Sequence, residues 1–436
     1  ASVSNGSSPS SVFEKDRILP ALERRREEGS LRKLQFSHQV GAIDFSSNDY
    51  LGLAQSREQF HLVEETFQKQ PQHVPRLGST GSRLLTGDSD YTRSLEDKLA
   101  KYHNSPAALL ANSGYDANLA VLSTLTMNNL VLMDELCHNS QQMGIRLSRN
   151  CKVKQFQHNN VKDLERLLLK ENSSANGSPQ SRHCVIVIES VYSMDGDRAP
   201  VVELFDVALR YNACVIVDEA HGLGVFGEYG MGVLSEFGLE NHPSLLCSVH
   251  TFGKAAGCHG AVICSSQNVK EYLLNYARPI IYSTAIALHA LVTIECSYET
   301  MRNHVGKRLR KQAYRAVQLF RTLLLEHQSV KNNKAGIQIQ LISSISPIQA
   351  LVVPGNQNCV EFCQRVATKT NGKIKLFPIR SPTVPKGQER VRVIVHAHNT
   401  DKEIQQLVEL MVSTLIEMKK AAVLEEEEES GMRSRL

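Results

Sequence analysis

Residues 214–221 read Cys-Val-Ile-Val-Asp-Glu-Ala-His, and this stretch decides the fold class. Its first four residues form a short apolar run rich in β-branched side chains, which predicts a strand buried on both faces of a parallel sheet. Asp218 stands at the carboxyl end of that run, where open α/β sheets bind their ligands. His221 follows three residues later and can reach the same place from the loop. The stretch therefore predicts an α/β protein with a binding site at the end of this strand.

A second apolar run, residues 245–249, leads into His-Thr-Phe-Gly-Lys-Ala-Ala-Gly at residues 250–257. Pyridoxal phosphate needs an amine for a Schiff base, a carboxylate beside its ring nitrogen, and donors for its phosphate and phenolic oxygen. Lys254, Asp218, His221 and Thr251 supply these groups. Alone, a strand-end aspartate is usually a helix cap and a lysine in a glycine-rich turn is usually solvated. Their joint occurrence favours a pyridoxal-phosphate site.

The phosphate of this cofactor should have a further anchor. Residues 107–111 predict a strand, and Asn112-Ser113-Gly114-Tyr115 opens a helical pattern that runs over residues 116–125. A helix N-terminus after a strand offers free N–H groups and a positive dipole end to an anion. The same residues can be an ordinary helix cap, and one cap can serve both purposes.

A competing motif lies at residues 222–227, which read Gly-Leu-Gly-Val-Phe-Gly and fit the dinucleotide fingerprint. That fingerprint needs a helix that starts inside it and an acidic residue about twenty positions further on. Gly230 and Gly232 interrupt the next segment, and Glu240 is too near. The sequence therefore disfavours a dinucleotide-dependent dehydrogenase.

With these motifs, the sequence resembles the α-oxoamine synthases of the fold-type I pyridoxal-phosphate enzymes over about residues 20–420. The resemblance rests on residues 45–53 (FSSNDYLGL), 78–83 (GSTGSR), 193–200 (SMDGDRAP), 217–222 (VDEAHG), the Lys254 segment, 281–284 (IYST) and 381–385 (SPTVP). It implies a transferase with a large, mostly parallel-sheet domain and a smaller α+β C-terminal domain. It also implies a homodimer.

The resemblance assigns catalytic roles to four residues. Lys254 would form the Schiff base and move the Cα proton, and Asp218 would pair with the pyridine nitrogen. His221 would contact the phenolic oxygen, together with Ser193, and His138 would stack on the ring face. The residues implied for the phosphate are Ser113, Gly114, Tyr115 and Thr251, with Thr284 reaching it from the neighbouring subunit.

The substrate residues implied by the resemblance are Arg32, Asn48, Ser82 and Arg392. Arg392 matches the arginine that grips the amino-acid carboxylate, a bidentate task for which lysine is a poor substitute. Ser82 stands where aminolevulinate synthases carry threonine, so it leaves room for the methyl group of alanine.

The resemblance is closest to the members that condense L-alanine with pimeloyl-CoA in biotin synthesis, releasing CoA and carbon dioxide. The alternatives are another member, such as a 2-amino-3-ketobutyrate CoA ligase or an aminolevulinate synthase, and a catalytically silent partner subunit. Silent subunits lose the Schiff-base lysine, which this chain keeps. A carrier-protein thioester in place of the CoA thioester stays open, as does the acyl length.

Composition excludes several other classes of protein. A net charge of +4 over 436 residues is too small to argue for nucleic-acid binding, and no apolar run is long enough to span a membrane. Ten cysteines without paired spacing favour a reducing compartment. Cys359 and Cys363 share a helical face, and burial explains them better than a metal site, so we expect no metal.

The chain divides into four predicted regions: an N-terminal arm (1–45, with 1–10 disordered), a large cofactor-binding domain (46–290), a small C-terminal domain (291–424) and an acidic tail (425–436). The tail ends in Ser434-Arg435-Leu436, which resembles the Ser-Lys-Leu peroxisomal address. We therefore expect a peroxisomal import receptor as a partner, with the cytoplasm as the alternative location.

Overall fold

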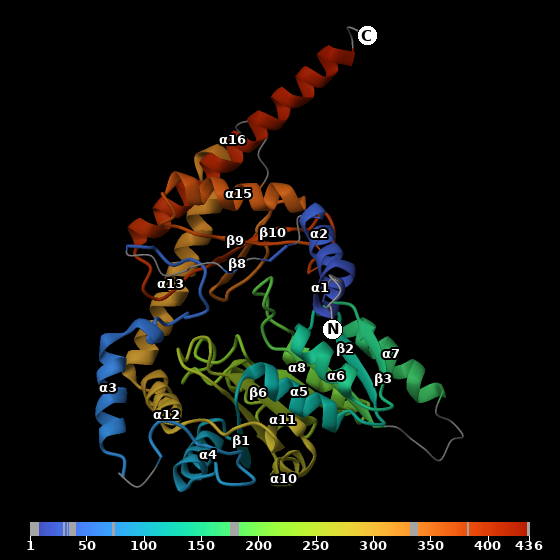
Figure 1. Cartoon of the computed structure of the whole chain (residues 1–436), viewed down its shortest axis with the longest axis vertical. Coiled ribbons are helices and arrows are strands. Elements are labelled where there is room, and N and C mark those ends of the chain that lie inside the picture. Colours follow the sequence, from blue (N-terminus) through green and yellow to red (C-terminus); the bar gives the residue numbers. More distant parts are fainter. Residues whose placement is uncertain are drawn as a thin grey trace, which may run out of the picture.

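The computed structural model describes residues 8–28, 31–32, 34, 41–71, 75–174, 183–331, 339–381 and 383–433. A large domain carries a seven-stranded sheet, and a small domain carries a three-stranded sheet and the helices α13, α15 and α16 (Figure 1). The expected pairing of a large α/β domain with a smaller α+β domain is confirmed.

The large domain alternates strands and helices, as a parallel sheet requires. Its elements are η2 (Leu53–Gln55), α3 (Arg57–Gln68), α4 (Asp90–Tyr102), β1 (Ala107–Ala111), α5 (Gly114–Leu125), β2 (Leu130–Asp134), α6 (Asn139–Leu147), β3 (Lys152–Phe156), α7 (Val161–Ser174), β4 (Cys184–Glu189), α8 (Val201–Arg210), β5 (Cys214–Asp218), α9 (Val233–Phe237), β6 (Leu245–Thr251), β7 (Ala261–Ser265), α10 (Gln267–Tyr276), α11 (Arg278–Ile281) and α12 (Leu288–Arg302).

The order of strands in the large sheet is β1-β7-β6-β5-β4-β2-β3. β7 runs antiparallel to both of its neighbours, and the remaining pairs are parallel. Glu189 at the end of β4 is in register with Asp218 at the end of β5, and Asp218 is in register with Val249 of β6. The carboxyl ends of these strands therefore bring the predicted site residues to one edge of the sheet.

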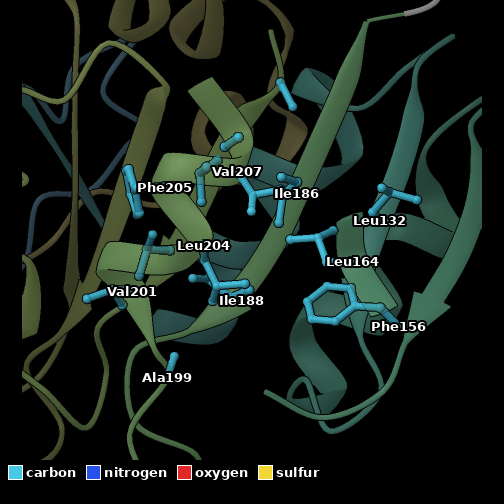
Figure 2. Close-up of a cluster of buried hydrophobic side chains, with 14 of the residues drawn as sticks. Leu132, Phe156, Leu164, Ile186, Ile188, Ala199, Val201, Leu204, Phe205 and Val207 are labelled. Atoms are coloured by element: carbon cyan, nitrogen blue, oxygen red, sulfur yellow. The ribbon is translucent and has the colours of Figure 1, made fainter. Parts of the chain in front are cut away.

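Apolar side chains on both faces of the large sheet hold its helices in place. On one face, Leu164 of α7 and Leu204 of α8 converge on Ile186 and Ile188 of β4 (Figure 2). All four side chains are buried, and each contributes about 1.5–3 kcal/mol through its removal from water. This packing fixes β4 and β5, and with them the positions of the acidic residues at the carboxyl ends of the two strands.

The small domain contains α13 (His304–Glu326), α14 (Gln328–Lys331), β8 (Ile348–Val352), α15 (Asn356–Lys369), β9 (Phe377–Ile379), β10 (Arg390–Ile394) and α16 (Asp401–Arg433). β10 lies between β8 and β9 and is antiparallel to both. The boundary predicted between residues 290 and 291 falls inside α12. Leu291 and Ile294 of that helix pack mainly with residues of the large domain, in a cluster that Ile348 and Ile394 of the small domain join.

The N-terminal arm consists of α1 (Pro9–Phe13), the π-helix η1 (Glu14–Ile18) and α2 (Leu19–Glu27). Pro9 and Ser10, predicted to be disordered, are helical because Ser8 caps α1 and proline is favoured in a first turn. Residues 1–7 of that prediction lie outside the described residues.

At the other end of the chain, α16 extends away from the small domain (Figure 1) and stays helical to Arg433, past the predicted start of the acidic tail. The tripeptide Ser434–Leu436 lies outside the described residues. Within the described part of the chain, no helix combines the length and hydropathy that crossing a membrane requires.

Candidate active site

Asp218 is held as an acceptor at the end of β5. Its Oδ1 accepts a hydrogen bond from the backbone N–H of Ala220 at 2.8 Å, and its Oδ2 accepts one from Nδ2 of Asn118 at 2.7 Å. Asn118 comes from the helix α5, a hundred residues earlier in the chain. Two donors fix the orientation of this buried side chain, and a carboxylate is the group that pairs with a protonated ring nitrogen.

Lys254, His221 and Tyr50 form a line of hydrogen bonds. Nζ of Lys254 lies 2.7 Å from Nε2 of His221, and Nδ1 of His221 lies 2.6 Å from the hydroxyl of Tyr50. That hydroxyl donates to Oδ1 of Asn48 at 3.2 Å, so it accepts from Nδ1 of His221 and leaves Nε2 as an acceptor for the lysine amine. Three residues from three segments thus orient the amine.

Burial sets the charge states along this line. It lowers the pKa of Lys254 to about 8, against the attraction of Asp218 and Glu189 for the charged amine. Burial, with the nearby Lys254 and Arg392 cations, lowers the pKa of His221 well below its usual value. The imidazole is therefore neutral at neutral pH, and about a tenth of the lysine amine is neutral as well.

Arg392 reaches the same line from β10 of the small domain. Its Nη2 donates to Oδ1 of Asn48 at 3.0 Å, so two residues that the resemblance assigns separately to the substrate contact each other. Its Nε is buried without a hydrogen-bond partner. A buried N–H without a partner is costly, and the carboxylate of an amino acid satisfies such a donor well.

His138 follows β2 and caps α6. Its Nδ1 lies 2.8 Å from Oγ of Ser140, and its backbone N–H donates to Oε1 of Glu189 at 2.6 Å. Partial desolvation lowers the pKa of His138, and burial beside Asp218 raises the pKa of Glu189 well above its usual range. As a whole, the residue is exposed.

The predicted anion site is a helix N-terminus. The hydroxyl of Ser113 accepts from the backbone N–H of Asp116 at 3.0 Å and begins α5. Gly114 packs so closely on Thr251 that an added Cβ would lie 2.9 Å from the threonine Cβ, so a side chain at position 114 would push the two segments apart. Tyr115 is 44% exposed beside them. Free N–H groups next to the hydroxyl of Thr251 suit a phosphate.

Ser82 and Thr284 lie together beside Asn112. Their backbones form an antiparallel bridge, and the carbonyl of Thr284 accepts from Nδ2 of Asn112 at 2.9 Å. Asn112 directly precedes the anion site, so both residues lie near it within a single chain. The assignment of Thr284 to a neighbouring subunit stays a prediction.

Two predicted site residues are not joined to this constellation. Ser193 is half-buried in the turn between Val191 and Arg198, whose backbones form a bridge. Arg32 is exposed, and in the described part of the chain no hydrogen bond or ion pair connects it with a site residue. The roles implied for them by the resemblance stay predictions.

Three residues of the site were not predicted from the sequence: Tyr50, Asn118 and Glu189. Glu189 had a signal, because it ends an apolar strand just as Asp218 does. Tyr50 lies two residues from Asn48 within a recognised block, but its buried contact with His221 depends on the tertiary fold. Asn118 resembles any polar residue on an amphipathic helix, and nothing in its spacing distinguishes it.

The glycine-rich segment 222–227 forms turns, and the next helix begins only at Val233. No helix starts inside the segment, so the rejection of the dinucleotide fingerprint is confirmed.

Comparisons with known proteins agree with this geometry. A family profile described as aminotransferase class I and II matches residues 40–411. The chain is 38% identical to an 8-amino-7-oxononanoate synthase of Emericella nidulans over 95% of this chain and 98% of the relative. It is 34% identical to the enzyme of that name from Yersinia pseudotuberculosis (strain IP 31758), over 91% of this chain and 98% of the relative.

Two solved structures are similar throughout. The 8-amino-7-oxononanoate synthase of Francisella tularensis superposes with a TM-score of 0.68 at 26% identity, covering 89% of this chain and 99% of that chain. The serine palmitoyltransferase of Sphingomonas wittichii gives 0.76 at 24% identity, covering 92% and 98%, which shows the shared fold. The chain therefore belongs to the class I and II aminotransferase family of pyridoxal-phosphate enzymes, as an α-oxoamine synthase homologous to the 8-amino-7-oxononanoate synthases.

Proposed function

We propose that this enzyme condenses L-alanine with pimeloyl-CoA to give 8-amino-7-oxononanoate, CoA and carbon dioxide, a step of biotin synthesis. The observation that carries the proposal is the 38% identity over 95% of the chain with the Emericella nidulans synthase. In this reaction, the alanine Cα forms a bond to the thioester carbonyl, and the C–S bond breaks. The alanine carboxylate then leaves as carbon dioxide, and a proton takes its place.

The residues of the site suit these steps. Pyridoxal phosphate, when bound, supplies the electron sink that makes the Cα proton acidic. Nζ of Lys254, with its pKa lowered to about 8, can exist as the neutral amine that accepts this proton and as the ammonium that returns one. His221 keeps the amine in place, and the guanidinium of Arg392, next to Asn48, orients the alanine carboxylate.

We also propose that the active species is a homodimer. Large apolar side chains are exposed around the Ser82–Thr284 bridge: Leu77 is 93% exposed, Leu85 81% and Tyr282 78%. Apolar side chains that cluster on a surface favour association with another chain. A partner that covers them would bring its own Thr284 segment close to the site.

Import into peroxisomes is a separate proposal and rests on the sequence alone. The import receptor reads an exposed C-terminal tripeptide, and Ser434-Arg435-Leu436 retains its small, basic and leucine positions. The proposal applies to the chain with this tripeptide as its free carboxyl terminus.

The experiment that tests the function is CoA release over a matrix of amino acids and acyl-CoA thioesters, with Lys254→Ala as the inactive control. We expect the highest kcat/KM for L-alanine with pimeloyl-CoA. A preference for glycine with acetyl-CoA or succinyl-CoA would instead identify a 2-amino-3-ketobutyrate ligase or an aminolevulinate synthase. A pimeloyl carrier-protein thioester should be included as a second acyl donor.

A further inference from the structure

A chain of buried hydrogen bonds links the carboxylate of Asp218 with the imidazole of His138. Nδ2 of Asn118 donates to Oδ2 of Asp218 at 2.7 Å and to Oγ of Ser140 at 3.0 Å. Oγ of Ser140 lies 2.8 Å from Nδ1 of His138. Asn118 is 2% exposed and Ser140 is 1% exposed, so water does not compete for these contacts.

In this series of hydrogen bonds, the donor and acceptor of each bond are determined by the bond before it. Because Asp218 accepts from Ala220 and from Asn118, it is the carboxylate that fixes which end of the Asn118 amide faces it. With the amide N–H groups turned toward Asp218 and Ser140, Oγ of Ser140 is an acceptor for Asn118. Its own proton is then free to go to Nδ1 of His138.

A second contact supports this direction. The backbone N–H of Ser140 also points to Nδ1 of His138, at 3.2 Å, and an N–H can only donate. Nδ1 therefore accepts two hydrogen bonds, and the proton of the neutral ring resides on Nε2. The backbone of His138 is fixed independently, because its N–H donates to Oε1 of Glu189 at 2.6 Å.

We propose that Asn118 and Ser140 are positioning residues that couple the charge on Asp218 to the tautomer of His138. The ionised carboxylate orients the Asn118 amide, the amide orients the Ser140 hydroxyl, and the hydroxyl keeps Nδ1 of His138 unprotonated. His138 consequently carries the proton of its neutral ring on Nε2 while Asp218 stays negative. The inference rests on the pyridoxal-phosphate site and does not depend on which acyl donor the enzyme uses.

The buried, unpartnered Oδ1 of Asn118 is consistent with this role. An amide whose only task was to cap or to pack would be expected to satisfy its carbonyl as well, because a buried carbonyl without a partner costs about 1–3 kcal/mol. Turning the amide over would place that carbonyl against the Asp218 carboxylate. The observed orientation is therefore the one that a negative Asp218 selects.

The test uses the holoenzyme with 15N-labelled histidine, and His138 is assigned from the spectrum of His138→Gln. In the wild type, Nδ1 should give the resonance of an unprotonated nitrogen and Nε2 that of a protonated one. Ser140→Ala removes the shorter contact to Nδ1 and leaves only the backbone N–H at 3.2 Å, so the resonances of the two nitrogens should average between the two tautomers. An unchanged pair of resonances in Ser140→Ala would overturn the proposal.

A second readout follows the other end of the chain of hydrogen bonds. Asn118→Leu removes a donor from Asp218, so the ring nitrogen of the bound cofactor holds less positive charge and its Schiff-base proton is lost less readily. The pH titration of the cofactor absorbance should therefore move to higher pH by about one unit. Should Asn118→Leu fail to fold, Ser140→Ala decides by itself.

Kinetics separate a positioning role from a purely structural one. In Ser140→Ala we expect kcat to fall by about tenfold with KM for alanine almost unchanged, and Ser140→Thr, which retains a hydroxyl, should restore it. Thr124→Val is the matched control. Thr124 makes a buried 2.7 Å hydrogen bond to the carbonyl of Ala120 within α5, and it has no hydrogen bond to Asn118, Ser140 or His138. Equal losses in Ser140→Ala and Thr124→Val would refute the inference.

Discussion

Replacement of Arg392 by lysine provides a sharp test of how the amino-acid carboxylate is held. In the structure, Nη2 of Arg392 is committed to Asn48, and Nε is buried without a partner. The planar guanidinium can therefore offer the carboxylate its Nε–H, a donor whose position is already fixed by the contact with Asn48. Lysine would keep the positive charge, but it has no second donor at a fixed angle, and its ammonium would still be attracted to Oδ1 of Asn48.

The expected magnitude follows from one lost charge-assisted hydrogen bond, worth about 1.5–3 kcal/mol, which corresponds to a decrease of about 10–150-fold in kcat/KM for alanine. Because the carboxylate is bound before it leaves, most of this decrease should appear as a higher KM. The assay is steady-state CoA release at varied alanine with saturating acyl donor.

Arg365→Lys is the matched control for this replacement. Arg365 also lies in the small domain, but it pairs with Glu361 on the surface of α15, where an ion pair contributes little. We expect its kinetics to match the wild type. Arg392→Lys with an unchanged KM for alanine and a native circular dichroism spectrum would refute the assignment of Arg392 to the carboxylate.

Four further predictions address the amine, the substrate methyl group, the dimer and the targeting signal. Only the neutral amine of Lys254 can attack the aldehyde of the cofactor, and the pKa of this amine is lowered to about 8. The rate at which apoenzyme takes up the cofactor, followed by absorbance, should therefore rise with pH up to about 8 and level off above it. A rate that still rises steeply near pH 10 would contradict the lowered pKa. Ser82→Thr should penalise alanine relative to glycine by about 1–3 kcal/mol in kcat/KM, the usual effect of one methyl group, and equal losses would place selectivity elsewhere. If Thr284 serves the neighbouring subunit, a dimer of one Lys254→Ala chain and one Thr284→Ala chain contains one unaltered site, so a mixture of the two variants should recover activity. A fully active monomer in sedimentation experiments would exclude a shared site. Deletion of residues 434–436 should leave turnover intact and spread a fluorescent fusion through the cytosol, whereas a persistent punctate signal would rule out the tripeptide.

Much of the cofactor site could be predicted from the sequence because its groups are tied to local structure. An apolar β-branched run determines a buried strand, and the residue after such a run lies at the sheet edge whatever the rest of the fold does. Asp218 was recognisable for this reason, and the cap at Ser113 likewise depends on a few consecutive residues. The occurrence of Lys254 after a second apolar run, close behind Asp218 in the sequence, then indicated a pyridoxal-phosphate site.

The tertiary structure alone decided which distant groups meet. The contact between Arg392 and Asn48 joins residues at opposite ends of the chain, and the path from Asp218 through Asn118 and Ser140 to His138 crosses two helices and two strand ends. No local pattern marks such residues, because a hydrogen bond between segments depends on how the sheets and helices pack. The boundary predicted between residues 290 and 291 falls inside α12 for the same reason: an apolar helix has the same sequence pattern whichever core buries it, and only the packing shows which side chains surround Leu291 and Ile294.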